Sequence, residues 1–341
     1  MNGVIFDQLG RIACKPNEVV FTYANWNSNN NVNGITITYG NGNYISGRST
    51  TNGWNNPIVY SSTDLVNWTL RLQTTFGSTP LGWLPYASCY GNNTYAICGS
   101  SNGATVTHST GMTDWSFTYP SWSDTNSWVN DICYGTKFVV VGQTTSTSKI
   151  SYSTDCFSWT NSYSITGGTW LASICYGNGT YVVIGSNNDH TIKILTSGDG
   201  INWYDRGNGG ITGTTFSAQA GAQAVTYGNN TFVSNWGVYI FYSSDGISWN
   251  RTSLPTANYA GLCEMKFNQS DGLFYLAALV NNSPSFDIKV FTSSNGITWN
   301  PETIAGLTDK ARSNQVVNEI NTTVEPVFIT TNGISNIYYK S

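Results

Sequence analysis

Aromatic side chains beside amide and carboxylate groups carry the clearest chemistry in this sequence. Trp122 and Trp128 flank a short polar segment that contains Asp124 and Asn126, and Trp54 is followed directly by two asparagines. An indole ring can stack on the apolar C–H face of a sugar while neighbouring Asn and Asp side chains bind its hydroxyl groups. This combination predicts that the protein recognises a glycan.

Seven tryptophans are available for such a site, because six of the thirteen belong to a repeated turn. Three of the seven lie six or seven residues before a strand tyrosine in consecutive repeats, so packing between repeats is an equally good interpretation for Trp83, Trp128 and Trp170. The tryptophans that follow no repeat, and are therefore the better candidates for ligand contact, are Trp26, Trp54, Trp122 and Trp236.

Residues for catalysis are scarce in this chain. It contains two histidines, of which His108 lies in or near an expected strand, while His190 follows Asp189 in an expected loop. Neighbours in sequence seldom form a catalytic pair, so an exposed loop is the better interpretation of the second histidine. A glycosidase needs two carboxylates at a set separation, and nothing selects a pair among the loop acids Asp124, Asp189, Asp205, Asp287 and Asp309. With no phosphate-binding loop, Cys-x-x-Cys or His-rich metal spacing, we expect no enzyme, cofactor or metal site.

The repeated turn reads Ser, a short stretch with an acid, and then Trp, and it recurs about every 45 residues. Its copies are at 61–68, 109–115, 153–159, 197–203, 243–249 and 293–299. Asp and Asn side chains accept hydrogen bonds from backbone N–H groups two residues further on, which stabilises a turn. We therefore expect a folding role, and no part in catalysis or metal binding, for Asp64, Asp155, Asp199, Asp245 and Asn295.

A second signature precedes each of these turns: a strand that ends in an aromatic residue, then a Gly/Asn turn, most often Tyr-Gly-Asn, and then another strand. Gly and Asn accept the positive φ of a tight hairpin, so each unit is expected to hold four strands. A four-stranded unit of 40 to 50 residues is typical of a propeller blade. The sequence predicts one all-β domain over residues 1–341, a seven-bladed β-propeller with repeats starting near 35, 86, 130, 172, 223, 262 and 315.

The last of these repeats stops after its third strand. Residues 1–15, before the first repeat, are expected to supply the missing fourth strand and so close the ring. In this arrangement the non-turn tryptophans fall in connections on one face of the propeller, opposite the Tyr-Gly-Asn hairpins and the acidic turns.

The Ser-x-Asp-Gly-x-x-Trp turns resemble those of the Asp-box (bacterial neuraminidase repeat, sialidase-like) propellers, with a box one residue shorter than usual. The resemblance covers nearly the whole chain. It implies that the boxes lie on the rim away from the active site and are structural. The arginine triad, the Tyr–Glu pair and the acidic residue of a sialidase-type site have no recognisable counterpart here.

Composition limits the partners of this protein. Charged residues make up 9% of its 341 residues, and the net charge is −4. Nucleic acids and anionic membranes require clustered Lys and Arg, so neither is an expected partner. A neutral polar and aromatic surface is common in proteins that meet sugars and in virion or adhesin proteins.

The cysteines and the absence of a hydrophobic leader or membrane span indicate the place of synthesis. Cys89, Cys133 and Cys175 share one strand position with Thr38 and Thr226, which indicates a small buried residue and not a disulfide partner. We expect reduced thiols and synthesis in a cytoplasm, with the protein then exposed on a virion surface or retained in the cytoplasm.

Three functions are compatible with these observations. The first is a non-catalytic protein that binds a glycan or a cell-surface receptor through its tryptophan-rich face, as a tail or capsid-exposed component of a bacteriophage virion. The second is a purely structural virion protein whose partners are other virion proteins. The third is a divergent glycoside hydrolase.

Overall fold

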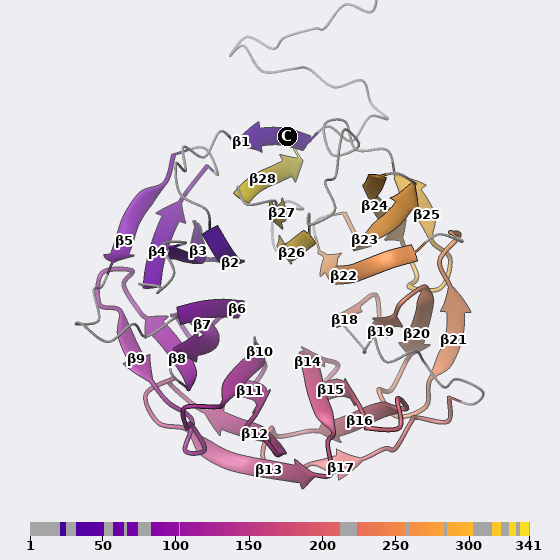
Figure 1. Ribbon diagram of the computed structural model, residues 1–341, viewed down its shortest axis with the longest axis horizontal. Helices are drawn as coiled ribbons and strands as arrows, with labels where there is room; N and C mark the ends of the chain where they lie inside the picture. Colours follow the sequence, from indigo (N-terminus) through magenta and orange to yellow (C-terminus); the bar gives the residue numbers. More distant parts are fainter. Residues whose placement is uncertain are drawn as a thin grey trace, which may run out of the picture.

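The computed structural model describes most of the chain, namely residues 21–24, 32–50, 57–64, 67–73, 83–101, 103–211, 224–256, 259–269, 271–282, 285–302, 316–321, 327–331 and 335–340. Strands in these ranges form seven antiparallel sheets of four strands each. The sheets are arranged in a ring like the blades of a propeller (Figure 1). The described part of the chain contains no helix with the length and apolar character of a membrane span.

Each sheet runs from an innermost strand at the centre of the ring to an outermost strand at its edge. The innermost strands are β2 (Val32–Gly40), β6 (Trp83–Gly91), β10 (Trp128–Tyr134), β14 (Trp170–Gly177), β18 (Val225–Gly228), β22 (Tyr259–Asn268) and β26 (Val316–Asn321). The second strands are β3 (Asn43–Thr50), β7 (Thr94–Ser101), β11 (Phe138–Gln143), β15 (Thr180–Ser186), β19 (Thr231–Trp236), β23 (Leu273–Asn282) and β27 (Val327–Thr331).

The two outer positions complete each sheet. The third strands are β4 (Pro57–Ser62), β8 (Ala104–Ser109), β12 (Thr147–Ser153), β16 (Ile192–Ser197), β20 (Tyr239–Ser243), β24 (Ser285–Ser293) and β28 (Ser335–Lys340). The outermost strands are β5 (Thr69–Gln73), β9 (Ser116–Thr118), β13 (Thr160–Thr166), β17 (Tyr204–Asp205), β21 (Asn250–Ser253), β25 (Asn300–Glu302) and β1 (Phe21–Ala24).

This alternation of strand direction gives the ring two distinct faces. The turn face carries the hairpins between first and second strands and the acidic turns between third and fourth strands. The loop face carries the connections between second and third strands and those that lead from one blade to the next. Blades are numbered 1 to 6 from β2–β5 to β22–β25, and blade 7 is the sheet that contains β26.

In blades 2 to 5, the tyrosine before the hairpin glycine packs against the hairpin glycine of the preceding blade. A side-chain carbon added at Gly40 of blade 1 would lie 2.1 Å from Cγ of Tyr90 in blade 2, so only glycine leaves room for that ring. The same close approach joins Gly91 to Tyr134 in the next pair of blades, at 2.0 Å. The Tyr-Gly pair therefore recurs because it forms the contact between blades near the centre of the ring.

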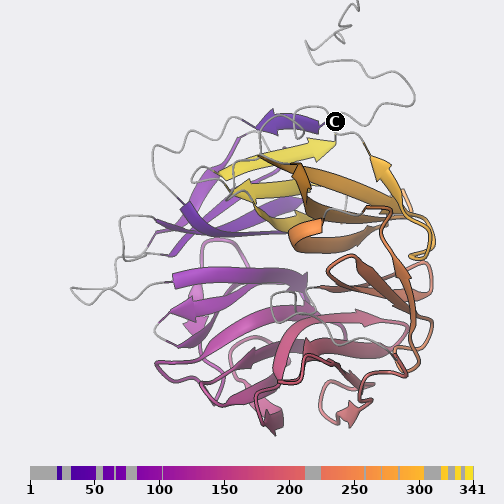
Figure 2. The same cartoon turned by 45° about the vertical axis from the view of Figure 1, so that its right-hand side comes forward.

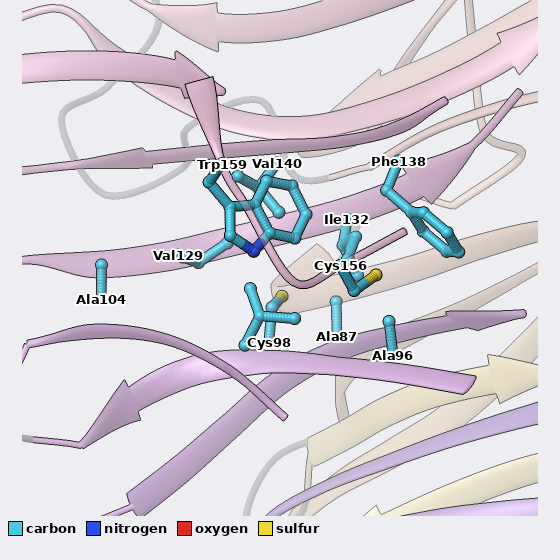
Figure 3. Close-up of a cluster of buried hydrophobic side chains, with 11 residues drawn as sticks. Ala87, Ala96, Cys98, Ala104, Val129, Ile132, Phe138, Val140, Cys156 and Trp159 are labelled. Atoms are coloured by element: carbon cyan, nitrogen blue, oxygen red, sulfur yellow. The ribbon is translucent and has the colours of Figure 1, made fainter. Parts of the chain in front are cut away.

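The hydrophobic core is divided among the spaces between neighbouring blades. One cluster joins Ala96, Cys98 and Ala104 of blade 2 to Phe138 and Val140 of blade 3, and all five side chains are buried (Figure 3). Similar clusters lie between the other successive blades that the structure describes in detail. Each blade is thus stabilised mainly by its two neighbours, as expected for a repeat architecture.

The prediction of how the ring closes needs correction. Six of the sheets consist of four consecutive strands, so the chain carries six complete repeats, and the seventh sheet combines both ends of the described chain. Its outermost strand is Phe21–Ala24, paired with Ser335–Lys340, and not a strand within residues 1–15 (Figures 1 and 2).

Two physical reasons favour this closing strand. Its sequence, Phe-Thr-Tyr-Ala, is rich in residues with high strand propensity. It also ends close to Val32, where blade 1 begins, and connections between elements of compact domains are usually short. Residues 1–15 themselves lie outside the described residues.

Candidate functional site

Two tryptophans of the loop face occupy equivalent positions at the start of neighbouring innermost strands. Trp128 is the first residue of β10 and Trp170 the first residue of β14. Each pairs with the residue that follows an equivalent glycine of the second strand, Gln143 after Gly142 and Ser186 after Gly185. Trp170 is 50% exposed and Trp128 is partly exposed, so both can meet a ligand.

Hydrogen bonds from blade 3 hold the backbone on both sides of Trp170. The Ser148 hydroxyl donates to the carbonyl oxygen of Thr169 over 2.5 Å, and Nδ2 of Asn130 donates to the carbonyl oxygen of Leu171 over 2.7 Å. Asn130 lies two residues after Trp128, at the bulge in β10. The two indoles are therefore carried on backbone segments that are fixed to each other and not on independent loops.

A polar loop follows β15 beside Trp170. Asn188 and Asp189 are exposed, and Nδ2 of Asn188 donates to the carbonyl oxygen of Gly167 over 3.1 Å. A side-chain carbon at Gly168 would lie 2.1 Å from the same nitrogen, so the Asn188 amide lies directly over the chain that leads into Trp170. An exposed ring, an amide and a carboxylate thus occupy one small region of the loop face.

The carboxylate in this loop is held in its ionised form. The hydroxyl of Thr191 donates to Oδ1 of Asp189 over 2.6 Å, and the Thr191 N–H donates to the same oxygen over 3.1 Å. These two bonds lower the pKa of Asp189, with the hydroxyl as the larger cause. An ionised carboxylate on the surface can accept hydrogen bonds from a pair of sugar hydroxyls.

The segment between Trp122 and Trp128 is only partly available to a ligand. The Trp122 indole lies over Gly142 and donates from Nε1 to the Ser151 hydroxyl over 2.7 Å, so this ring has mainly a packing role. Asp124 and Asn126 are exposed, but Oδ1 of Asp124 accepts the Asn126 N–H over 2.9 Å within the loop. These two residues can contribute polar groups beside the Trp128 indole.

Trp236 and Trp83, the other two predicted tryptophans that the structure describes, do not share this position. Trp236 is 2% exposed at the end of β19, in the core between blades 4 and 5, so its selection as a ligand contact does not fit its position. The strand pairing places Leu84, and not Trp83, in the register of Trp128 and Trp170. Trp26 and Trp54 lie outside the described residues.

The acidic turns have the hydrogen bonds expected of a structural element. Oδ1 of Asp199 accepts the N–H groups of Ile201 and Asn202, both over 2.8 Å, and the Ser197 hydroxyl over 3.0 Å. In the equivalent turns, nearby backbone N–H groups donate in the same way to a side-chain oxygen. The accepting residues are Asp64, Asp155, Asp245 and Asn295. Asp114, one residue before Trp115, binds the Gly111 N–H in this way.

A cavity of about 400 Å³ at the centre of the ring contains residues that the sequence-based search did not select. Its wall combines hairpin tyrosines with the shared Cys or Thr position of the innermost strands, and blade 6 places Lys266 at that position. Burial raises the pKa of the thiols Cys89 and Cys175, so both are protonated at neutral pH. Alignment of the repeats would have revealed the lysine, because the corresponding residues of blades 1 to 5 are uncharged.

A buried carboxylate links three blades beside this cavity. Oδ2 of Asp131 accepts the Ser173 hydroxyl over 2.7 Å and the Ile174 N–H over 2.9 Å, and Ser173 in turn accepts the Val225 N–H over 3.2 Å. Burial raises the pKa of Asp131, against the opposing influence of Lys266 and of these donors. Its position within the interface gives it a structural role, joining blades 3, 4 and 5.

Other groups that could perform chemistry are isolated. His108 is 1% exposed in β8, where its ring meets that of Phe157 edge-on at 4.5 Å, and burial lowers its pKa. His190 is exposed in the loop beside Asp189. Across the described ranges, no three His, Cys, Asp or Glu side chains are grouped so that they could hold a metal ion.

Comparisons with known proteins concern the fold. No protein-family model matches the sequence, and no curated protein matches it either. A catalytically inactive virginiamycin B lyase from Staphylococcus aureus with quinupristin has a similar structure, at 11% identity and a TM-score of 0.66, over 94% of this chain and 99% of that one. YCF48 from Cyanidioschyzon merolae matches at 12% identity and a TM-score of 0.58, over 94% and 98% of the two chains.

A lectin is also among the similar structures. Aleuria aurantia lectin in complex with alpha-methyl-L-fucoside matches at 14% identity and a TM-score of 0.46, over 82% of this chain and 97% of that one. At these identities, likeness extends to the arrangement of strands and not to a shared site. What the comparisons show for this chain is therefore the propeller fold alone.

Proposed function

We propose that this protein is a non-catalytic recognition protein that binds a glycan on its loop face, at the paired indoles of Trp128 and Trp170. The observation that carries the proposal is the 50% exposure of Trp170 on a backbone that blade 3 holds in place. Leaving half of an indole in water forgoes much of its burial energy, and fixing it beforehand lowers the entropy cost of binding. Both features suit a stacking platform for a sugar ring.

The surroundings of Trp170 support the same proposal. Asn188 and Asp189 lie in the adjoining loop and offer amide donors and carboxylate acceptors to hydroxyl groups. The overall composition, with only 9% charged residues, suits an uncharged polar partner. The same composition supports exposure on a bacteriophage virion, which mass spectrometry of purified particles would test.

A glycan array with the purified protein tests this function, followed by tryptophan-fluorescence titration of each hit. We expect saturable binding that Trp170→Ala abolishes while the circular dichroism spectrum stays unchanged. Tyr204→Ala is the matched control, because Tyr204 is 58% exposed on the outermost strand of the same blade. Absence of binding to every glycan by a folded sample would refute the proposal, and release of reducing sugar would show that the protein is an enzyme.

A further inference from the structure

We infer, on the basis of the proposed function, that the ligand is an uncharged oligosaccharide whose neighbouring sugar units stack on Trp128 and Trp170. Two independent observations lead to this ligand class. The first is the register of the two indoles across the boundary between blades 3 and 4. The second is the distribution of charged side chains over the same two blades.

The register of the indoles implies two stacking positions. Side chains alternate along a strand, and the residue after each tryptophan points into the interface with the preceding blade, where Val129 and Leu171 are fully buried. Trp128 therefore points toward blade 4, and Trp170 points the same way relative to its own blade, toward blade 5. Some Cα atoms of β10 and β14 lie within 8 Å of each other. The two indoles therefore occupy successive positions on an arc around the loop-face end of the central cavity. A single sugar ring covers one indole, so a second unit is needed to use both.

The charged side chains near these indoles are acidic. Asp124 and Asp189 are exposed on the loop face. The lysines and the arginine of blades 3 and 4 are bonded elsewhere: Lys137 to a turn-face carbonyl, Lys149 to Ser164 in the outermost strand, Lys193 to Asp205, and Arg206 to Thr196. An acidic sugar on this arc would thus meet carboxylates and no lysine or arginine of these two blades.

A further cationic side chain faces the central cavity. Lys266 lines the central cavity at the level of Cys175, which lies about 15 Å along the strand from Trp170 at the usual rise per residue. This distance places it beyond a sugar stacked on the loop face.

The experiment uses the unmodified protein with a chain-length series of a glycan identified on the array. Titration calorimetry at neutral pH compares the mono-, di- and trisaccharide, together with a disaccharide in which one unit carries a carboxylate. We expect affinity to rise about tenfold from mono- to disaccharide, little further gain for the trisaccharide, and weaker binding of the carboxylated form. Equal affinity for mono- and disaccharide, or tighter binding of the carboxylated form, would overturn the inference.

Variants separate this inference from the proposed function. Trp128→Ala is expected to remove the gain from the second unit while monosaccharide binding to Trp170 persists, and Tyr204→Ala is expected to leave the whole series unchanged. If no glycan of any length binds, the proposed function fails. If glycans bind with an affinity that does not depend on chain length, glycan binding is retained as the function. Only the stacking of two sugar units on Trp128 and Trp170 is then rejected.

Discussion

The turn face and the loop face of this propeller differ in how far they follow the repeat. On the turn face, successive blades carry the same acidic turn, whose side-chain oxygens bind backbone N–H groups a few residues away. On the loop face, the tryptophans of blades 3 and 4 share a register, whereas blade 2 has Leu84 at that position and blade 5 buries its Trp236. Features that every blade repeats serve folding, and departures from the repeat indicate where the protein meets a partner.

The largest effect on stability is expected from Gly177, whose neighbour across the blade boundary is Tyr227. A side-chain carbon at this glycine would lie 2.0 Å from Cγ of that tyrosine. Gly177→Ala should therefore lower the free energy of unfolding by about 3 kcal/mol, measured by urea denaturation. Gly198→Ala is the matched control, because the nearest atom to its added carbon lies 4.0 Å away. Equal stability of the two variants would show that the Tyr-Gly contact does not hold the blades together.

A smaller loss is expected when one acidic turn is altered. Asp199→Ala removes the acceptor for the Ile201 and Asn202 N–H groups and should cost about 1.5 kcal/mol in thermal or urea unfolding, with no change in ligand affinity. Asp199→Asn is the control and should cost much less, because Asn295 makes the same bonds in blade 6. Loss of binding without loss of stability would assign the turn face a functional role.

Acid should weaken the turns further. The Asn202 and Ile201 N–H groups lower the pKa of Asp199, and the Ser109 hydroxyl and Gly111 N–H do the same for Asp114. A carboxyl whose pKa is lower in the folded state contributes stability above its unfolded pKa of about 4, and that contribution is lost as pH falls below this value. The thermal unfolding midpoint of the unmodified protein should therefore decrease as the pH drops below about 4. The midpoint of Asp199→Asn should decrease less steeply over the same pH range. Identical pH profiles would exclude the turn carboxylates as the cause.

The smallest effect on stability is expected from Trp170→Ala. Because half of this side chain is exposed, its removal should lower the free energy of unfolding by only about 1 kcal/mol, less than expected for a fully buried tryptophan, while glycan affinity is lost. Paired urea denaturation and fluorescence titration measure both quantities on one sample. A large loss of stability would instead give Trp170 the packing role that Trp236 has between blades 4 and 5.

The local repeats made much of this architecture predictable. The strand that closes the ring of blades could not be inferred from them. Tyr-Gly-Asn hairpins and acidic turns are formed by a few consecutive residues, so their geometry can be inferred from side-chain chemistry alone. The outermost strand of blade 7 pairs with residues more than three hundred positions away, and a short segment carries little information about so distant a partner. The choice of residues 1–15 in place of Phe21–Ala24 failed for this reason.

The candidate site illustrates the same division. Its residue types, indoles beside Asn and Asp, were recognisable in the sequence, and Trp128, Trp170, Asp124 and Asn126 were among those selected. Their exposure was not recognisable, since Trp122 and Trp236 have the same side chain and are packed against neighbouring strands. Lys266 was also not selected: its repeat position could be found by aligning the repeats, but its place in the cavity depends on the innermost strands of blades 1 to 6 meeting at one axis.

The sequence by itself determined the strand repeat, the hairpins, the structural turns and the neutral polar character of this protein, because each depends on neighbouring residues or on composition. Only the tertiary structure decided which tryptophans remain exposed, which strand closes the ring, and which side chains face the central cavity. These properties depend on contacts between blades that lie far apart in the chain. The neighbouring positions of Trp128 and Trp170 likewise depend on tertiary contacts, because β10 and β14 meet only when blades 3 and 4 pack together.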